Sequence, residues 1–432
     1  MISLKSIFDI RPGEKAKTLF MAGYFFLTIA LVYILKPIRN SLFLEEMGAG
    51  NLRYAYIGEG FFLFLVVAAY IQLTRLIPKK IFFPLILGFF ALNLCLFWLF
   101  LKWKIPYTSA FFYIWVDSFT ITITTQFWLL ANGVFTTQQG KRLFGIIISG
   151  GSLGGIMGGF LTSRAVRFVA TEDLLLVTAG FVGLCMVLTL VTESMEFKNS
   201  YDDFTSGHAD PEAPESGDSV FKIFLTHPYF VYLCVLVILA KVASTIADNQ
   251  FVATVESVIS GKEARTAFFG NFMAWLNAAS FALQLFATGP LLRRFGINAL
   301  WILPAGLTLL CFGGWFYPLF GMVLAFRIFD GSVNYSIQQA SKELLFLPIP
   351  GALRPRIKPV IDMLGFRLAK ALAGVYIALA SGIFRVDNQH IGKLILGLIP
   401  IWIFMLLGIK KEYSKIPPHP ALNESSILLQ KK

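Results

Sequence analysis

Long apolar runs separated by short polar segments form the main pattern along this 432-residue chain. A run of about 20 apolar residues is long enough to cross a lipid bilayer as a helix. The pattern predicts twelve such spans, at 18–36, 54–76, 81–101, 107–132, 143–168, 174–192, 227–250, 267–290, 297–316, 318–343, 360–383 and 393–410. Hydrophobic residues make up 56% of the chain and charged residues only 14%. We therefore expect an all-α integral membrane protein whose main partner is the lipid bilayer.

One long polar segment divides the predicted spans into six and six. Residues 193–218 contain eight acids and one lysine, a composition that favours a flexible linker. We expect an N-terminal six-helix bundle at 1–192, an acidic cytoplasmic linker at 193–220, and a C-terminal six-helix bundle with a short basic tail at 221–432. The rest of the chain is thus more basic than the net charge of +12 indicates. Such a surplus can serve anionic lipid or an anionic substrate.

Basic residues in the short loops indicate the orientation of the chain. They gather before the first span, after the second, fourth, eighth and tenth spans, and after the last one, which predicts that both termini are cytoplasmic. Some basic residues lie on the opposite side, among them Lys102, Lys104, Arg164 and Arg167.

Motifs for metal binding or catalysis are missing from the sequence. The four cysteines and four histidines are scattered, without metal-ligand spacing, so we expect no metal and no cofactor. The glycine-rich run ISGGSLGGIMGGF at 148–160 lacks the GxxxxGK[ST] pattern of a phosphate-binding loop. Glycines at such spacing in an apolar helix indicate close helix packing. We expect no enzyme, and any transport should run on gradients or exchange.

The two halves share short internal matches, as expected of transporters built from repeats. LVYILKPIRNSLF at 31–43 aligns with LVILAKVASTIADNQF at 236–251, which sets Lys36 beside Lys241. A second match sets YIWVDSF beside RIFDGSV and brings Asp117 near Asp330. Each match pairs charged residues inside a predicted span.

Charged and polar side chains inside the spans are the candidate functional residues, because an ion in hydrocarbon is costly and needs a partner or a wet cavity. Several share one helical face, such as Asp117 with Thr120 and Thr124. These stripes predict a shared polar cavity. The basic members are Lys36, Arg39, Lys241, Arg327, Lys342, Arg367 and Lys370, and the acidic ones are Asp117, Asp248, Asp330, Glu343 and Asp362. They could pair only with one another and hold the bundle together, but the surplus of basic groups favours an anionic ligand.

Three segments resemble the ATP/ADP translocases of plastids and obligate intracellular bacteria. FW, AN and TTQQGKRLFG within 127–145 are similar to a family run of FW, AN, TT and KR. YSIQQASKELLFLPIP and KPVIDMLGFRLAK at 335–370 are similar to its KE, P, ID, G, RL and K pattern, and ILKPIRNSL at 34–42 to its first-helix lysine segment. The resemblance covers most of the chain, which is identified as a divergent member.

The resemblance implies a fold like the major facilitator superfamily and a central cavity in which charged residues meet a nucleotide. Lys36 and Lys370 match family lysines, Asp248 stands near the family's seventh-helix acid, and Asp117 stands close to its fourth-helix Glu. Trp128 could stack on a base, and Asn132 completes the candidate set. The implied activity is exchange of ATP and ADP across a bacterial inner membrane. We expect no nucleic-acid partner, and a monomer is sufficient.

Two other hypotheses fit the same residues. The cargo could be another phosphorylated or carboxylated anion, with proton coupling through Asp117 or Asp330. Alternatively, the chain could be a membrane protein that keeps the fold without transporting anything. Failure of nucleotides to compete, together with uptake driven by pH, would favour the first hypothesis. Intact function of Lys36→Ala and Lys370→Ala would favour the second.

Overall fold

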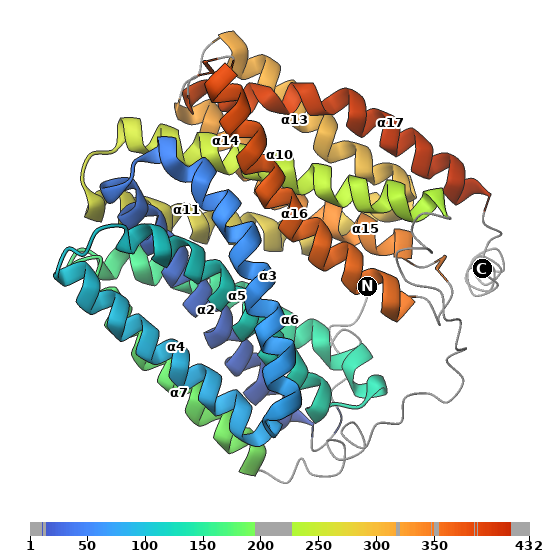
Figure 1. The fold of residues 1–432 in the computed structure, drawn as a ribbon. Coiled ribbons are helices and arrows are strands. Elements are labelled where there is room, and N and C mark those ends of the chain that lie inside the picture. Colours follow the sequence, from blue (N-terminus) through green and yellow to red (C-terminus); the bar gives the residue numbers. More distant parts are fainter. Residues whose placement is uncertain are drawn as a thin grey trace. The chain divides into compact units, whose positions relative to one another are not determined.

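The computed structural model of the protein is helical in its regular elements (Figure 1). It describes residues 11, 14–194, 227–316, 320–346, 348–349, 354–383, 385–386 and 388–415. The predicted linker at 193–220 lies outside these residues except for its first two positions, which end helix α7. The chain divides into two compact units, Met1–Pro211 with Val252–Phe281, and Glu212–Phe251 with Ala282–Lys432.

Unit 1 contains the long helices of the first part of the chain. They are α2 (Lys15–Glu46), α3 (Leu52–Leu76), α4 (Lys79–Lys102), α5 (Thr108–Val134), α6 (Thr137–Ala165), α7 (Leu174–Ser194) and α11 (Lys262–Ala282), with the short η1 (Ala49–Asn51). Helices α4 and α7 lie side by side (Figure 1). The end of α10 (Pro228–Val258) also belongs to this unit, so the boundary at Phe251 falls inside a continuous helix.

Unit 2 contains the start of α10 and the elements from Ala282 onward. These are η2 (Leu283–Thr288), α12 (Gly289–Phe295), η3 (Gly296–Trp301), α13 (Ile302–Phe316), α14 (Phe320–Val333), η4 (Asn334–Gln338), α15 (Gln339–Phe346), α16 (Arg354–Ile383), η5 (Asn388–Lys393) and α17 (Leu394–Ser414). Two of these segments, η2 and η4, are π-helical turns. The two units differ from the expected halves because residues 252–281 group with unit 1.

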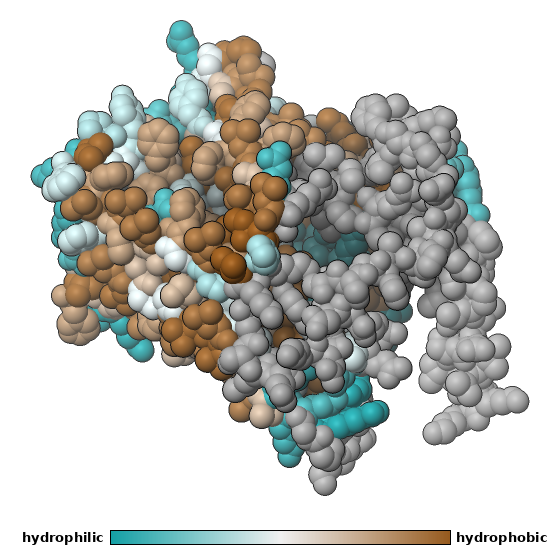
Figure 2. Space-filling model, turned by 60° about the horizontal axis from the view of Figure 1, so that its bottom comes forward, coloured by the Kyte–Doolittle hydropathy of each residue, from teal (hydrophilic) through white to brown (hydrophobic). Residues whose placement is uncertain are grey.

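Eight helical segments of the described chain are long and apolar enough to cross a membrane. One of them, Lys262–Phe312, covers two of the predicted spans, and the polar helix α5 is not among the eight. The all-helical membrane fold is therefore confirmed, while the number of twelve spans stays a prediction. Many large apolar side chains are exposed, including Phe61, Phe64 and Leu65 on α3. Figure 2 shows apolar residues over much of the visible face, as a lipid-facing surface requires.

Glycines bring α6 directly against α2. A Cβ added to Gly150 would lie 2.6 Å from the carbonyl oxygen of Ala22, and one added to Gly158 would lie 2.5 Å from that of Ala30. Gly154 faces the carbonyl oxygen of Phe26 in the same way. Since a Cβ does not fit at such distances, the glycines allow the two backbones to touch, which confirms the packing expected of this run.

Helix α11 is held in unit 1 by a second close contact and by polar contacts near its start. A Cβ added to Gly270 would lie 2.8 Å from the carbonyl oxygen of Gly159 on α6. Lys262 forms an ion pair with Glu172, and the hydroxyls of Thr171 and Thr266 are 3.1 Å apart. These contacts explain why residues 252–281 group with the first part of the chain.

The loop before α7 carries a more exposed ion pair. The Nζ of Lys102 lies 2.9 Å from Oδ1 of Asp173, and the indole Nε1 of Trp98 donates to the same oxygen at 2.9 Å. The hydrogen bond from Lys102, followed by that from Trp98, lowers the pKa of Asp173. The pair joins the end of α4 to the start of α7 in unit 1.

Candidate functional site

A buried arginine joins three helices of unit 1. Arg39 on α2 forms ion pairs with Asp117 on α5 and with Glu59 on α3, whose Oε1 is 3.4 Å from Nη1. Arg39 Nε also donates to Oδ1 of Asn40 at 3.3 Å, and its guanidinium carbon lies 4.2 Å from the ring centroid of Tyr113. The planar guanidinium suits such a site, because it can bind carboxylates and an aromatic face together.

A buried arginine of unit 2 is also bound by two carboxylates. On α14, Arg327 Nη1 lies 2.7 Å from Oδ2 of Asp330, and Nη2 lies 2.8 Å from Oδ1 of Asp248 on α10. Ser244 on α10 donates to the same Asp330 oxygen at 2.8 Å. Asp330 is fully buried. The cluster therefore holds α10 and α14 together through one cation, Arg327, and two anions, Asp248 and Asp330.

Residues from the two internal sequence matches contact one another in these clusters. With Lys36 set beside Lys241, Arg39 falls beside Ser244, three residues further on in both helices. Arg39 contacts Asp117 in unit 1, and Ser244 contacts Asp330 in unit 2. Asp117 and Asp330 are themselves the acids of the second match. In each unit, one residue of the first match thus contacts one acid of the second match, as expected if the units descend from a repeated arrangement.

Lysines provide the remaining basic groups of the candidate site. Each arginine cluster contains two acids, and the other basic candidates whose side chains the structure describes are Lys36, Lys241, Lys342 and Lys370. Lys36 is half-buried, and its Nζ lies 4.8 Å from the ring centroid of Tyr33. Lys370 is half-buried on α16. The structure therefore separates arginines in compact ion clusters from partly accessible lysines.

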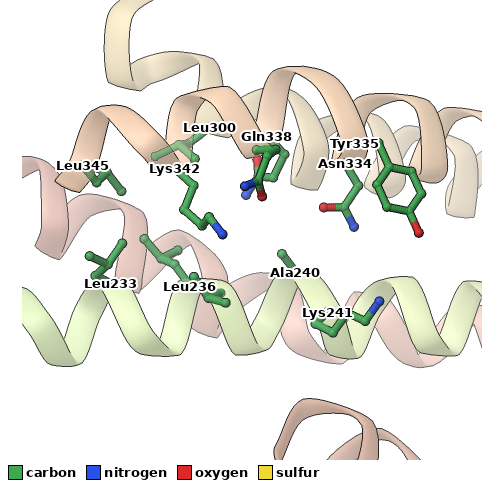
Figure 3. A pocket seen from close by; sticks show the side chains of 12 residues that line it. Leu233, Leu236, Ala240, Lys241, Leu300, Asn334, Tyr335, Gln338, Lys342 and Leu345 are labelled. Carbon is green, nitrogen blue, oxygen red and sulfur yellow. The ribbon is translucent and has the colours of Figure 1, made fainter. Parts of the chain in front are cut away.

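Two of the lysines line one pocket of unit 2, with a volume of about 130 Å³. Figure 3 shows Lys342 extending from α15 on one wall and Lys241 on α10 on the opposite wall. The other lining residues are Leu233, Leu236, Val237, Ala240, Leu300, Asn334, Tyr335, Gln338, Gln339 and Leu345. The pocket combines two ammonium groups and three amides with an apolar end of leucines.

Three other predicted residues belong to helices α5 and α16. Trp128 packs against Phe25, Phe127 and Phe144, with ring centroids 5.3 to 5.5 Å apart, which indicates a role in the core of unit 1. Asn132 is exposed near the end of α5. Arg367 belongs to α16, but its side chain lies outside the described part of the chain.

The sequence reasoning missed Glu59. Its side chain is only 2% exposed, and it shares Arg39 with Asp117. The signal was available, since Glu59 is an acid inside an apolar run, as is Asp117. Including Glu59 reduces the expected surplus of basic groups over acidic groups, because Arg39 then has two acidic partners.

The arrangement of the helices matches solved membrane transporters. The chain aligns with the nucleoside transporter NupG with a TM-score of 0.66 at 13% identity, over 91% of this chain and 99% of that one. It aligns with a POT family transporter with a TM-score of 0.61 at 12% identity, over 92% and 96% of the two chains. The fold is thus like that of these transporters.

Similarity in sequence points to a narrower group. The chain is 20% identical to ADP,ATP carrier protein 1 of Rickettsia conorii over 478 aligned positions, and 22% identical to that of Rickettsia typhi over 486, with 95% of each chain covered. ADP,ATP carrier protein 3 of Rickettsia prowazekii is 21% identical over 73% of both chains. No protein-family profile matches the chain.

These likenesses define the chain as an integral membrane transporter, in agreement with the prediction that it is not an enzyme. More particularly, it is a divergent relative of the ADP,ATP carrier proteins of Rickettsia, as the sequence motifs predicted.

Proposed function

We propose that the protein exchanges nucleotides of the ATP and ADP type across a membrane by alternating access. The names of its full-length relatives support this activity. The observation that carries it is a half-buried lysine at aligned positions of the two units, Lys36 on α2 and Lys241 on α10. Ammonium groups bind phosphate oxygens through charge-assisted hydrogen bonds.

The ion clusters have a separate role in this proposal. Arg39 and Arg327 hold helices together, and Asp117, Asp248 and Asp330 anchor the arginines. The substrate is bound by Lys36, Lys241, Lys342 and Lys370, and we retain Arg367 and Asn132 as candidates. We place the protein in a bacterial inner membrane as a monomer with cytoplasmic termini, in two bundles joined by the acidic linker.

Exchange is tested with purified protein in liposomes. Uptake of labelled ATP is measured with and without ADP inside, at equal pH on both sides. We expect uptake only with internal ADP, and a loss of at least about tenfold in Lys36→Ala, because a charge-assisted hydrogen bond contributes about 1.5–3 kcal/mol. Lys411→Ala, at an exposed position in the last turn of α17, is the matched control and should transport normally.

Two outcomes would redirect the proposal. Uptake of another organic anion driven by a pH gradient, without competition by nucleotides, would favour a proton-coupled carrier. Normal exchange in Lys36→Ala and in Lys370→Ala would remove these lysines from the binding site.

A further inference from the structure

The pocket between α10 and the η4–α15 segment has room for one part of a substrate. Its volume of about 130 Å³ is below the roughly 300–1,000 Å³ of pockets that enclose a complete drug-sized ligand. All twelve lining residues belong to unit 2, so the pocket is formed without any contribution from unit 1. The chemistry of its walls therefore decides which part of a larger molecule fits there.

Half of the residues that line the pocket are aliphatic. They are Leu233, Leu236, Val237, Ala240, Leu300 and Leu345. Figure 3 shows leucines on both walls at one end of the cavity. Such walls suit a flat ring with apolar faces, which every nucleobase has, and they give no hydrogen bonds to a phosphoryl group, which is polar on all sides. The apolar end therefore favours the base of a nucleotide over its phosphates.

Gln338 supplies a polar partner for the edge of such a ring. The residue is only 7% exposed, and its Oε1 has no hydrogen-bond partner among the described residues. Figure 3 shows the amide on the pocket wall between Lys342 and Asn334. Because a buried carbonyl oxygen without a partner is costly, a ligand that brings an N–H group to Gln338 Oε1 gains binding free energy. An amino group on the edge of a base is a donor of this kind.

The backbone that carries Gln338 is irregular. Residues Asn334–Gln338 form the π-helical turn η4 between α14 and α15. π-Helical turns interrupt regular helices and often occur at functional sites. Asn334, at the other end of this turn, also lines the pocket. The turn therefore presents two amide side chains to the same cavity.

We propose that this pocket recognises a nucleobase that carries an amino group beside a ring nitrogen, as adenine does. The leucines cover the faces of the ring, Gln338 Oε1 accepts a hydrogen bond from the amino group, and Nε2 of the same amide donates to the ring nitrogen. This is the usual pairing of a glutamine with adenine. The recognition of the base requires no charge on Lys241 or Lys342, which also line the pocket. The inference rests on the proposed function and deepens it, because it names the residue that selects among nucleotides.

Adenosine and inosine are the discriminating probes. Inosine has a carbonyl oxygen where adenosine has the amino group, and neither nucleoside has a phosphate. Their binding is measured by calorimetry on the full-length protein in lipid discs, where no transport takes place. We expect adenosine to bind at least about tenfold more tightly than inosine, because inosine in the same position would place an acceptor against Gln338 Oε1.

Variants assign the preference to residues. Gln338→Leu should reduce the preference for adenosine to less than about threefold. Leu236→Ala should weaken the binding of both nucleosides by about three- to tenfold and leave their ratio unchanged, because it shortens an apolar wall. Gln126→Leu is the matched control, since Gln126 on α5 is 4% exposed with both amide atoms unpartnered among the described residues, but does not line this pocket. Melting temperatures close to that of the parent show that each variant is folded.

The results separate the base subsite from nucleotide exchange. Equal binding of adenosine and inosine by the parent protein, absence of adenosine binding, or an unchanged preference in Gln338→Leu would overturn the subsite, whether or not ATP and ADP are exchanged in liposomes. A preference for adenosine that depends on Gln338, combined with failure of ATP and ADP exchange, would keep the subsite and reject nucleotide exchange.

Discussion

Units 1 and 2 share an ion cluster but differ in how their helices pack. In each unit one buried arginine is bound by two carboxylates, and the aligned acids Asp117 and Asp330 take part. The glycines of α6 in unit 1 touch the backbones of α2 and α11. In unit 2, a Cβ added to Gly365, Gly306 or Gly408 would meet side chains instead. The two units therefore have similar ion clusters around their arginines, although their glycines differ in the contacts they make.

The arginines give the largest expected effect. Arg327→Met and Arg39→Met should each destabilise the protein by about 3–5 kcal/mol, since two buried carboxylates lose their cation. The two losses should be similar, because each arginine is bound by two carboxylates and the side chains of both clusters are at most 17% exposed. Thermal unfolding of the purified variants, followed by loss of the monodisperse peak in gel filtration, measures both.

Replacing the complete cluster provides the control for that comparison. Arg327→Met combined with Asp248→Leu and Asp330→Leu should recover much of the stability, because the uncompensated charges are gone. If the triple variant is as unstable as Arg327→Met alone, the loss comes from packing and not from charge.

An intermediate effect is expected at Ser244, which occupies the position aligned with Arg39. Ser244→Ala should cost about 1.5–3 kcal/mol, because it removes a hydrogen bond to the fully buried Asp330 carboxylate. Ser280→Ala is the matched control, since Ser280 bonds only to the carbonyl of Leu276 in its own helix. Thermal unfolding of the two variants compares them. Equal small losses would show that the aligned contact contributes nothing special.

The glycine contacts are expected to have the smallest and most variable effect, about 1–3 kcal/mol for overpacking. Gly154→Ala would push α6 away from the Phe26 carbonyl of α2, whereas Gly145→Ala, on the same helix, has no neighbour within 4 Å. Melting temperatures should fall for Gly154→Ala and stay level or rise for Gly145→Ala. Equal melting temperatures would mean that the helices separate without cost.

The sequence predicted the elements of this fold better than their contacts. Apolar runs located α4 and α7 closely, since length and hydropathy set where a helix can enter lipid. They underestimated α2, which continues to Glu46 because polar residues end an apolar run without ending a helix. The alignment of Lys36 with Lys241 found the region of both clusters, and the spacing of charges found Arg327 with Asp330.

The sequence did not predict which residue forms an ion pair with each charged side chain. Asp117 pairs with Arg39, which is 78 positions away in the sequence, and Asp248 pairs with Arg327, which is 79 positions away. Helical spacing reports only neighbours on one helix, so it gives no partner on another. Helical spacing likewise does not predict the π-helical turn η4. This turn shifts the polar residues Asn334 and Gln338 from the positions that a regular α-helix would give them.

The backbone contact of α6 with α2 also has a consequence for how this gene can change. Every replacement of a glycine by another amino acid introduces a side chain, so at Gly150, Gly154 and Gly158 each replacement meets a carbonyl oxygen of the neighbouring helix. Lipid-facing positions such as Phe61 and Leu65 can drift among apolar residues. Between distant descendants of this chain, these three glycines should therefore outlast most of the sequence around them.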